Sequence, residues 1–277
     1  TILSHPEYLS FYWKKLRREF AFFNFDYNLL NGYSFPPKSI CLILTEKCNL
    51  KCVMCDIGQK NAREDTLGSF PLADAIGKGN RQMELDDWKR VVDDIVESNW
   101  KPLLLLTGTE PFIYPEVLAL IEYILKKNIP LHITTNGSLL SSYAHRLVDM
   151  AEKPGSLSLT LSLDGIGEIH DTIRGVRGTF DKAIKGLEEI TSRKRIIKRR
   201  WPEITICYTI SHLNYRHITE FAEWFRDKDY DLAGITFSHL WFRDEEIVEG
   251  HNKLYGKLFP VSKENLTGLD IAAIDME

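Results

Sequence analysis

Cysteine is scarce in this chain, in which five cysteines occur among 277 residues. An odd number of thiols cannot all pair, and no secretory signal is visible in the sequence, so the pattern argues against a disulfide framework. We therefore expect a protein of a reducing compartment, the cytoplasm.

Long apolar stretches and a strong net charge are also missing. The most apolar run, residues 103–106, consists of four leucines between Pro102 and Gly108, which is typical of a buried strand rather than of a membrane-spanning helix. The net charge of −4 at neutral pH gives no sign of nucleic-acid binding. We expect neither a nucleic acid nor a membrane as a partner.

Three of the five cysteines stand close together, because Cys48, Cys52 and Cys55 follow the spacing C-x3-C-x2-C. Three thiolates at this spacing suit three irons of a [4Fe-4S] cubane and leave the fourth iron open. Clusters that only carry electrons usually have four cysteine ligands. The motif therefore indicates a cluster at which a substrate or cosubstrate completes the coordination.

A structural zinc site is the alternative for these cysteines, but such a site is closed by four protein ligands. Cys41 precedes Cys48 by seven residues in a predicted strand, which separates the two by roughly 23 Å of extended chain. Cys207 is far downstream, and no histidine lies within the motif. Cys41 and Cys207 are instead predicted to be buried apolar residues.

Strand-like and helix-like segments alternate along the chain from residue 40. Apolar residues at helical spacing predict helices that begin near Leu85, Pro115, Leu139, Phe180 and Ile218. The predicted strands are residues 40–45, 103–107, 131–135, 157–163, 204–210 and 234–239. Strict alternation predicts a parallel sheet with right-handed crossovers. Six units rather than eight predict an α/β fold, a partial (β/α)6 TIM-like barrel.

Two of the predicted strands have one polar face. In residues 157–163 leucines alternate with Ser158, Thr160 and Ser162, and in residues 204–210 isoleucines alternate with Thr205 and Cys207. Closed eight-stranded barrels fill their interior with branched apolar side chains. A polar interior therefore predicts a ligand cavity, although two strands that face solvent would give the same pattern.

Four further motifs follow the predicted strands, and together with the cysteines they resemble the radical S-adenosylmethionine (radical SAM) superfamily. The last of them is typical of the branch of molybdenum-cofactor synthesis and peptide-modifying enzymes. Thr109 replaces the second glycine of the family's Gly-Gly-Glu-Pro segment. The motifs are Thr-Gly-Thr-Glu-Pro at 107–111, Thr-Thr-Asn-Gly at 134–137, Ser-Leu-Asp-Gly at 162–165, and His-Asp-x-x-Arg-Gly at 170–175 with Gly-Thr-Phe at 178–180.

This resemblance implies a partial barrel that holds a [4Fe-4S] cluster on Cys48, Cys52 and Cys55 and binds S-adenosylmethionine (SAM). The implied SAM contacts are Gly108 and Thr109 to the amino group, Glu110 as a turn-fixing residue or acceptor, Arg174 to the carboxylate, Asn136, Ser162 and Asp164 as candidates for the ribose, and Met54 near the adenine. Each of these short motifs also has a simpler interpretation as a turn, and Asp171 with Arg174 as a surface ion pair.

The implied reaction is reductive cleavage of SAM to a 5′-deoxyadenosyl radical, which removes hydrogen from a peptide or small-molecule substrate. An external donor such as flavodoxin or ferredoxin supplies the electron. Cys207, on the polar face, is a candidate for donating a hydrogen atom to a substrate radical. The alternatives are a non-catalytic iron–sulfur or structural metal protein, and an ordinary α/β-barrel enzyme in which the cysteines are incidental.

The resemblance covers roughly residues 38–240 and divides the chain into three parts. We expect an N-terminal helical extension (1–37), the partial barrel (38–240) and a C-terminal extension (241–277). No cysteine follows Cys207, so the Cys-rich extension of many peptide-modifying relatives is missing, which implies a single cluster or a piece of a longer protein. Residues 56–82 are predicted as a lid or recognition loop, and the basic residues 193–200 as a solvated surface.

Overall fold

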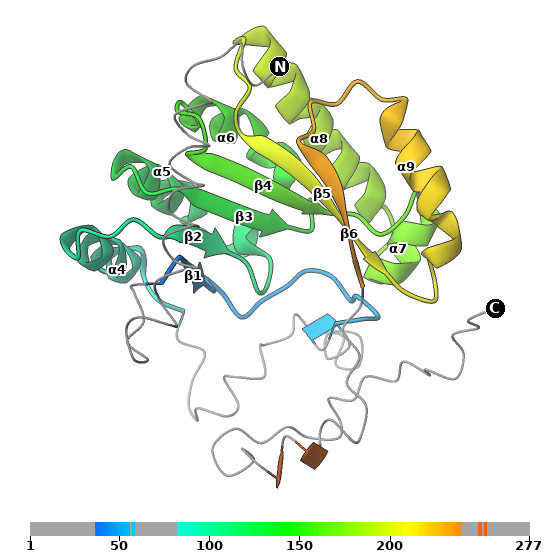
Figure 1. Ribbon diagram of the computed structural model, residues 1–277, viewed down its shortest axis with the longest axis horizontal. Helices are drawn as coiled ribbons and strands as arrows, with labels where there is room; N and C mark the ends of the chain where they lie inside the picture. Colours follow the sequence, from blue (N-terminus) through cyan, green and yellow to red (C-terminus); the bar gives the residue numbers. More distant parts are fainter. Residues whose placement is uncertain (1–36, 56, 59–81, 240–248, 251, 254–277) are drawn as a thin grey trace, which may run out of the picture.

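The computed structural model describes residues 37–55, 57–58, 82–239, 249–250 and 252–253 (Figure 1). The predicted terminal extensions and nearly all of the predicted loop 56–82 lie outside these residues. The division into three parts therefore stays a prediction, and the fold is that of the predicted barrel.

Six strands form one sheet in which each strand is parallel to its neighbours and the spatial order follows the chain (Figure 1). The strands are β1 (Ser39–Leu42), β2 (Leu103–Leu106), β3 (Leu131–Thr135), β4 (Leu157–Ser162), β5 (Glu203–Ile210) and β6 (Gly234–His239). Right-handed crossovers between consecutive parallel strands place every connecting helix on the same face of the sheet. The predicted partial (β/α)6 barrel is confirmed.

The helices cover the outer face of this sheet. They are α4 (Leu85–Glu97), α5 (Val117–Lys126), α6 (Ala144–Met150), α7 (Glu168–Arg174), α8 (Thr179–Ile196) and α9 (Ile218–Arg226), with short 3-10 turns η2 (Pro111–Ile113), η3 (Leu140–Ser142) and η4 (Tyr215–His217). The segment predicted as one helix from Leu139 is thus η3 followed by α6, and Pro115 lies just before α5 rather than in its first turn. No helix in the described residues is long and apolar enough to cross a membrane.

The core lies between the sheet and the helices. Leu104, Ile133, Leu159 and Ile206 are 1% exposed or less and point toward the helices. Burial of one such side chain contributes about 1.5–3 kcal/mol. The alternate residues of β4 and β5 are only half-buried, so the concave face of the sheet is the polar one, as the alternation predicts.

The basic segment 193–200 is more structural than its sequence indicates. Lys194 is 2% exposed, and its ammonium donates to the carbonyl oxygen of Pro202 at 3.1 Å and pairs with the Asp231 carboxylate at 2.8 Å. Arg193 forms a bidentate pair with Asp149. The prediction of a solvated basic surface was therefore wrong for Lys194, which joins α8 to the segments that enter β5 and β6.

Helix α7 does not feature in the sequence prediction, and it holds two neighbouring elements in place. From within α7 the Asp171 carboxylate accepts hydrogen bonds from the Phe180 N–H, the Gly178 N–H and the Thr179 hydroxyl, and so caps the N-terminus of α8. This role replaces the predicted surface ion pair of Asp171 with Arg174.

The C-terminal end of α7 supports the loop that carries the three clustered cysteines. The backbone N–H of Lys51 donates to the Arg174 carbonyl at 3.0 Å, and that of Val53 donates to the Ile173 carbonyl at 2.9 Å. Gly175 follows with φ +68°, and a Cβ atom built there would lie 2.2 Å from the Lys51 carbonyl oxygen. Only glycine permits this approach of helix and loop.

Replacing Asp171 by alanine removes the cap of α8. We expect the free energy of unfolding to fall by about 1–2 kcal/mol at pH 7, measured by urea denaturation, whereas Asp94→Ala on the exposed face of α4 changes it little. Burial acts to raise the pKa of Asp171, but the Phe180 and Gly178 N–H groups outweigh it and lower the pKa below its ordinary value. The stabilisation is therefore complete above an ordinary aspartate pKa of about 4 and is lost as the pH falls below it. An equal loss at pH 7 in both variants would contradict the cap.

The Gly175→Ala variant tests the close contact between α7 and the cysteine loop. We expect a loss of unfolding free energy of at least about 1–3 kcal/mol, because the methyl group adds a clash to the left-handed backbone strain. Gly178→Ala is the matched control, since Gly178 has φ +77° but open space around the added Cβ. A Gly178 variant that is as unstable as the Gly175 variant would show that strain alone, and not the contact, accounts for the effect.

Candidate functional site

A cavity of about 140 Å³ opens at the carboxyl edge of the sheet, where the loops after β1, β2, β3 and β4 meet. Parallel α/β folds build their sites at this edge. The cavity brings together the three clustered cysteines and most of the residues predicted from the strand-end motifs. Its lining residues are Cys48, Leu50, Cys52, Met54, Cys55, Ile57, Gly108, Thr109, Glu110, Thr134, Thr135, Asn136, Ser162 and Arg174.

The three thiols share this cavity, with Cys52 buried and Cys48 and Cys55 half-buried. Burial raises the pKa of Cys48 to about 12 and also raises the pKa of Cys52, against which Arg174 acts. Within the described residues no three side chains of metal-binding type converge on one point. The three thiols that line this cavity are the side chains in it that could hold the irons of a cluster.

Glu110 joins the ends of two strands. Its carboxylate, 1% exposed, accepts the Asn136 N–H at 2.8 Å, the Thr135 hydroxyl at 2.8 Å and the Phe112 N–H at 3.2 Å. Burial raises the pKa of Glu110 to about 7, and these hydrogen bonds oppose the rise. The residue thus fixes the turn after β2 against the end of β3 and places an ionisable group beside the cavity.

Asn136 holds the cysteine loop from the other side. Its side-chain amide donates to the Asn49 side-chain oxygen at 2.9 Å, and Asn49 in turn donates to the Ser138 hydroxyl at 2.9 Å. Asn49 was missed by the sequence analysis. The only available signal was its position next to Cys48, because its partners lie 87 and 89 residues away.

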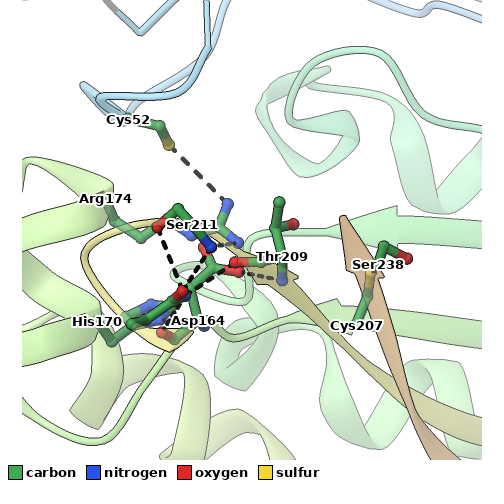
Figure 2. A network of polar contacts seen from close by, with 9 residues as sticks. Cys52, Asp164, His170, Arg174, Cys207, Thr209, Ser211 and Ser238 are labelled. Atoms are coloured by element: carbon green, nitrogen blue, oxygen red, sulfur yellow. Dashed lines mark hydrogen bonds and ion pairs between the residues drawn. The ribbon is translucent and has the colours of Figure 1, made fainter. Parts of the chain in front are cut away.

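Arg174 and Asp164 form a buried ion pair beneath the cysteine loop (Figure 2). Arg174 Nη2 lies 2.7 Å from Asp164 Oδ2, and the two side chains are 9% and 0% exposed. On its other side Arg174 Nη1 lies 3.9 Å from Cys52 Sγ. Burial disfavours the guanidinium cation, but Asp164 and Cys52 outweigh this and raise its pKa, so Arg174 stays protonated.

Asp164 is itself fixed by its surroundings. Its Oδ1 accepts the Thr209 N–H at 2.8 Å and its backbone N–H donates to His170 Nδ1 at 3.1 Å (Figure 2). Its carbonyl oxygen accepts from the Asn214 amide at 2.9 Å. Burial lowers the pKa of His170 to about 3, so His170 is neutral and acts as an acceptor here. Neither His170 nor Asn214 was assigned a role from the sequence.

The other residues predicted to contact SAM differ in whether their polar groups already have hydrogen-bond partners. Thr109 donates its hydroxyl to the Thr45 carbonyl at 2.6 Å, and Gly108 has φ +97°. The Ser162 hydroxyl makes no hydrogen bond within the described residues. The predicted ribose contact of Asp164 stays a prediction, but in this structure both of its carboxylate oxygens have partners and it does not line the cavity.

The two isolated cysteines differ from their prediction as buried residues. Cys41 is exposed, and Cys207 is half-buried with its Sγ 3.9 Å from the Ser238 hydroxyl (Figure 2). Cys41 alternates along β1 with Ile40 and Leu42, which pack against the core, so its side chain lies on the opposite face of the sheet. Cys207 belongs to the polar concave face and does not line the cavity of the cysteine loop.

Comparison with known sequences places this geometry in a family. A model of the radical SAM superfamily matches residues 42–225. The AdoMet-dependent heme synthase of Methanosarcina barkeri (strain Fusaro / DSM 804) is 29% identical over 210 residues, which cover 74% of this chain and 50% of that protein. The antilisterial bacteriocin subtilosin biosynthesis protein AlbA of Bacillus subtilis (strain 168) is 25% identical over 202 residues, 73% of this chain and 38% of that protein. The chain thus spans half or less of the length of these relatives.

Solved structures share the fold at low sequence identity. anSMEcpe with bound AdoMet has a TM-score of 0.55 and 20% identity, over 82% of this chain and 61% of that chain. Streptococcus suis SuiB bound to S-adenosylmethionine has a TM-score of 0.53 and 17% identity, over 76% of this chain and 42% of that chain. The family match extends over more than half of the sequence and includes the cysteine loop and strands β2 to β5. The chain belongs to the radical SAM superfamily.

Proposed function

We propose that this chain binds a [4Fe-4S] cluster through Cys48, Cys52 and Cys55 and cleaves SAM reductively to start a radical reaction. The family uses this cluster and SAM. The observation that carries the proposal is the single cavity that joins the three thiols to the polar ends of β2, β3 and β4. When bound, the cluster supplies one electron to the sulfonium of SAM.

The residues present fit such a cluster. The three thiols line one cavity, and burial raises the pKa of Cys48 and of Cys52, so these two thiols are protonated in the absence of the cluster. Thiolates are the ligands of irons, so cluster binding releases protons. The loop is held in place by Asn49 and Asn136 and by the backbone of α7, and this fixes the positions of the thiols independently of the irons.

The cavity also offers a charged partner to each end of the SAM amino-acid group. Arg174 Nε is buried and has no hydrogen-bond partner within the described residues, which suits the carboxylate. Glu110, near its own pKa at neutral pH, suits the ammonium, with Gly108 and Thr109 beside it. Ser162 has its hydroxyl available for the ribose, and Met54 lines the wall proposed for the adenine.

In the proposed reaction the electron breaks the bond between sulfur and C5′, which gives methionine and the 5′-deoxyadenosyl radical. This radical then takes a hydrogen atom from the substrate and becomes 5′-deoxyadenosine. Reduced flavodoxin or ferredoxin is the proposed electron donor, since enzymes of the family use an external one. The rest of the chain supports the residues that hold the cluster and SAM, and it excludes water.

The proposed substrate is a peptide or small molecule bound on the polar concave face of the sheet. Thr160, Thr205 and Cys207 lie there half-buried, so hydroxyl groups and one thiol are accessible from the open side. A similar fold binds a peptide, since one solved structure is SuiB bound to the precursor peptide SuiA, with a TM-score of 0.51. Cys207 stays a candidate hydrogen-atom donor.

The first test is anaerobic turnover. We expect protein reconstituted with iron and sulfide and reduced with dithionite to convert SAM to 5′-deoxyadenosine, detected by chromatography. The Cys52→Ala variant removes one cluster ligand and should lose this product entirely, whereas Cys41→Ala, an exposed cysteine outside the cavity, should retain it. A complete cluster that SAM neither perturbs spectroscopically nor reacts with would favour the electron-transfer or structural alternative.

The second test concerns Glu110 and SAM affinity. All three hydrogen-bond donors around Glu110 point at its carboxylate, so in Glu110→Gln the side-chain N–H₂ group faces one of these donors. The substitution also removes the negative charge that is proposed to pair with the SAM ammonium. We expect SAM affinity, measured by calorimetry on cluster-loaded protein, to fall at least about tenfold, or roughly 1.4 kcal/mol.

The pH profile distinguishes the charge of Glu110 from its structural role. Because the pKa of Glu110 is raised to about 7, SAM affinity should increase from pH 6 to pH 8 in the unmodified protein as the carboxylate ionises, and should be flatter in Glu110→Gln. Glu116→Gln, an exposed residue outside the cavity, should leave both the affinity and the profile unchanged. A variant with normal affinity would contradict the assignment.

A further inference from the structure

Arg174 is the only cationic side chain that lines the cavity in the described part of the chain, and it contacts a proposed cluster ligand directly. Its guanidinium has three edges in different directions. Nη2 meets Asp164 at 2.7 Å, Nη1 lies 3.9 Å from Cys52 Sγ, and Nε has no partner within the described residues. The charge therefore stands between a buried carboxylate and a sulfur atom (Figure 2).

Asp164 fixes the position of the Arg174 guanidinium. Its side chain is 0% exposed, and an isolated carboxylate at such a depth would be strongly disfavoured. The Thr209 N–H from the end of β5 holds Oδ1, while His170 and Asn214 hold its backbone. Because Oδ1 is bound to the sheet, the direction of Oδ2 is fixed. The planar guanidinium of Arg174, which pairs with Oδ2, therefore has a fixed orientation as well.

The consequence concerns the electron that the cluster accepts. A reduced cluster carries one more negative charge than an oxidised one. Hydrogen bonds to the ligand sulfurs and nearby positive charge stabilise the reduced form and raise the reduction potential, whereas nearby negative charge lowers it. Both effects are stronger away from water, because the effective dielectric constant is lower there.

We propose that the Asp164–Arg174 pair sets the reduction potential of the cluster, with Arg174 acting through Cys52 and Asp164 as the positioning residue that holds and partly offsets the Arg174 charge. This inference rests on the proposed function, because it requires the cluster to be bound. It assigns Asp164 a role through Arg174 and not through contact with SAM.

The competing explanation is that the pair only ties α7 to the end of β4. The two explanations differ in sign. If the pair acts electrostatically, removing the cation and removing the anion shift the potential in opposite directions. If it acts only as a structural tie, the two isosteric substitutions disturb the cysteine loop alike and shift the potential in the same direction or not at all.

The experiment is a reductive titration of the reconstituted cluster without SAM, at pH 8, monitored by electron paramagnetic resonance, with iron content measured for each protein. We expect Arg174→Gln to have a lower midpoint potential than the unmodified protein and Asp164→Asn a higher one. If the Arg174→Gln protein does not retain its cluster, Arg174→Lys takes its place and should also shift downward, because a single ammonium that pairs with Asp164 loses the second N–H toward Cys52.

A second pair of an arginine and an aspartate, partly exposed and remote from the cavity, provides the control. Arg193 and Asp149 form a bidentate pair between α8 and α6, whose C-terminal ends lie toward the amino ends of the strands and away from the cavity. Arg193→Gln and Asp149→Asn should leave the midpoint potential unchanged.

The outcomes separate the inference from the proposed function. Opposite shifts in the two cavity variants and none in the control pair support the inference. A complete cluster whose potential shifts in one direction for both variants, or does not shift, overturns the inference and leaves the proposed function standing. Unmodified protein that assembles no cluster overturns both.

Discussion

The parallel direction of all six strands is the constraint on which this protein depends. Because every strand runs the same way, every strand ends at the same edge of the sheet, and the loops that follow β1 to β4 must meet there. Residues that are distant in sequence, such as Cys48, Glu110 and Ser162, thereby line one cavity. The helices on the outer face supply the apolar burial that holds this edge together, so the stability of the fold and the geometry of the site have largely separate origins.

The two buried ionisable side chains of the cavity, Glu110 and Arg174, have different sets of partners. Glu110 is satisfied by backbone and hydroxyl donors from its own and the neighbouring strand end, so it needs no cation beside it. Arg174 is instead neutralised by Asp164. Glu110 and Arg174 are therefore not joined in one salt bridge, although both side chains line the cavity. This arrangement is the basis of the contacts proposed above for the ammonium and the carboxylate of SAM.

Strict periodicity made the sheet predictable, whereas the contacts between motifs were not. The predicted bounds of β3 and β6 agree with the structure to the residue, because apolar alternation and flanking turns mark them. Helix α7 was missed because it has only seven residues and lies between glycines, so its two apolar residues give no readable period. Asp164 and Arg174 were each recognised as site residues, but the sequence contains no signal that the end of β4 and α7 meet. The same holds for Asn49 and Asn136, which are 87 residues apart.

The sheet remains open, since β1 and β6 are its two edges within the described residues. In a closed barrel the strand number, tilt and stagger determine one another and so fix the diameter. An open sheet has no such closure condition, and its curvature is set only by local twist and by the helices packed behind it. The thiol cavity is lined from the ends of β1 to β4 and from α7, and β5 reaches it only through the Thr209 N–H that holds Asp164. The distance between the two edge strands is therefore not tied to the number of strands, and substitutions in the helices or loops can change it while the strand order stays the same.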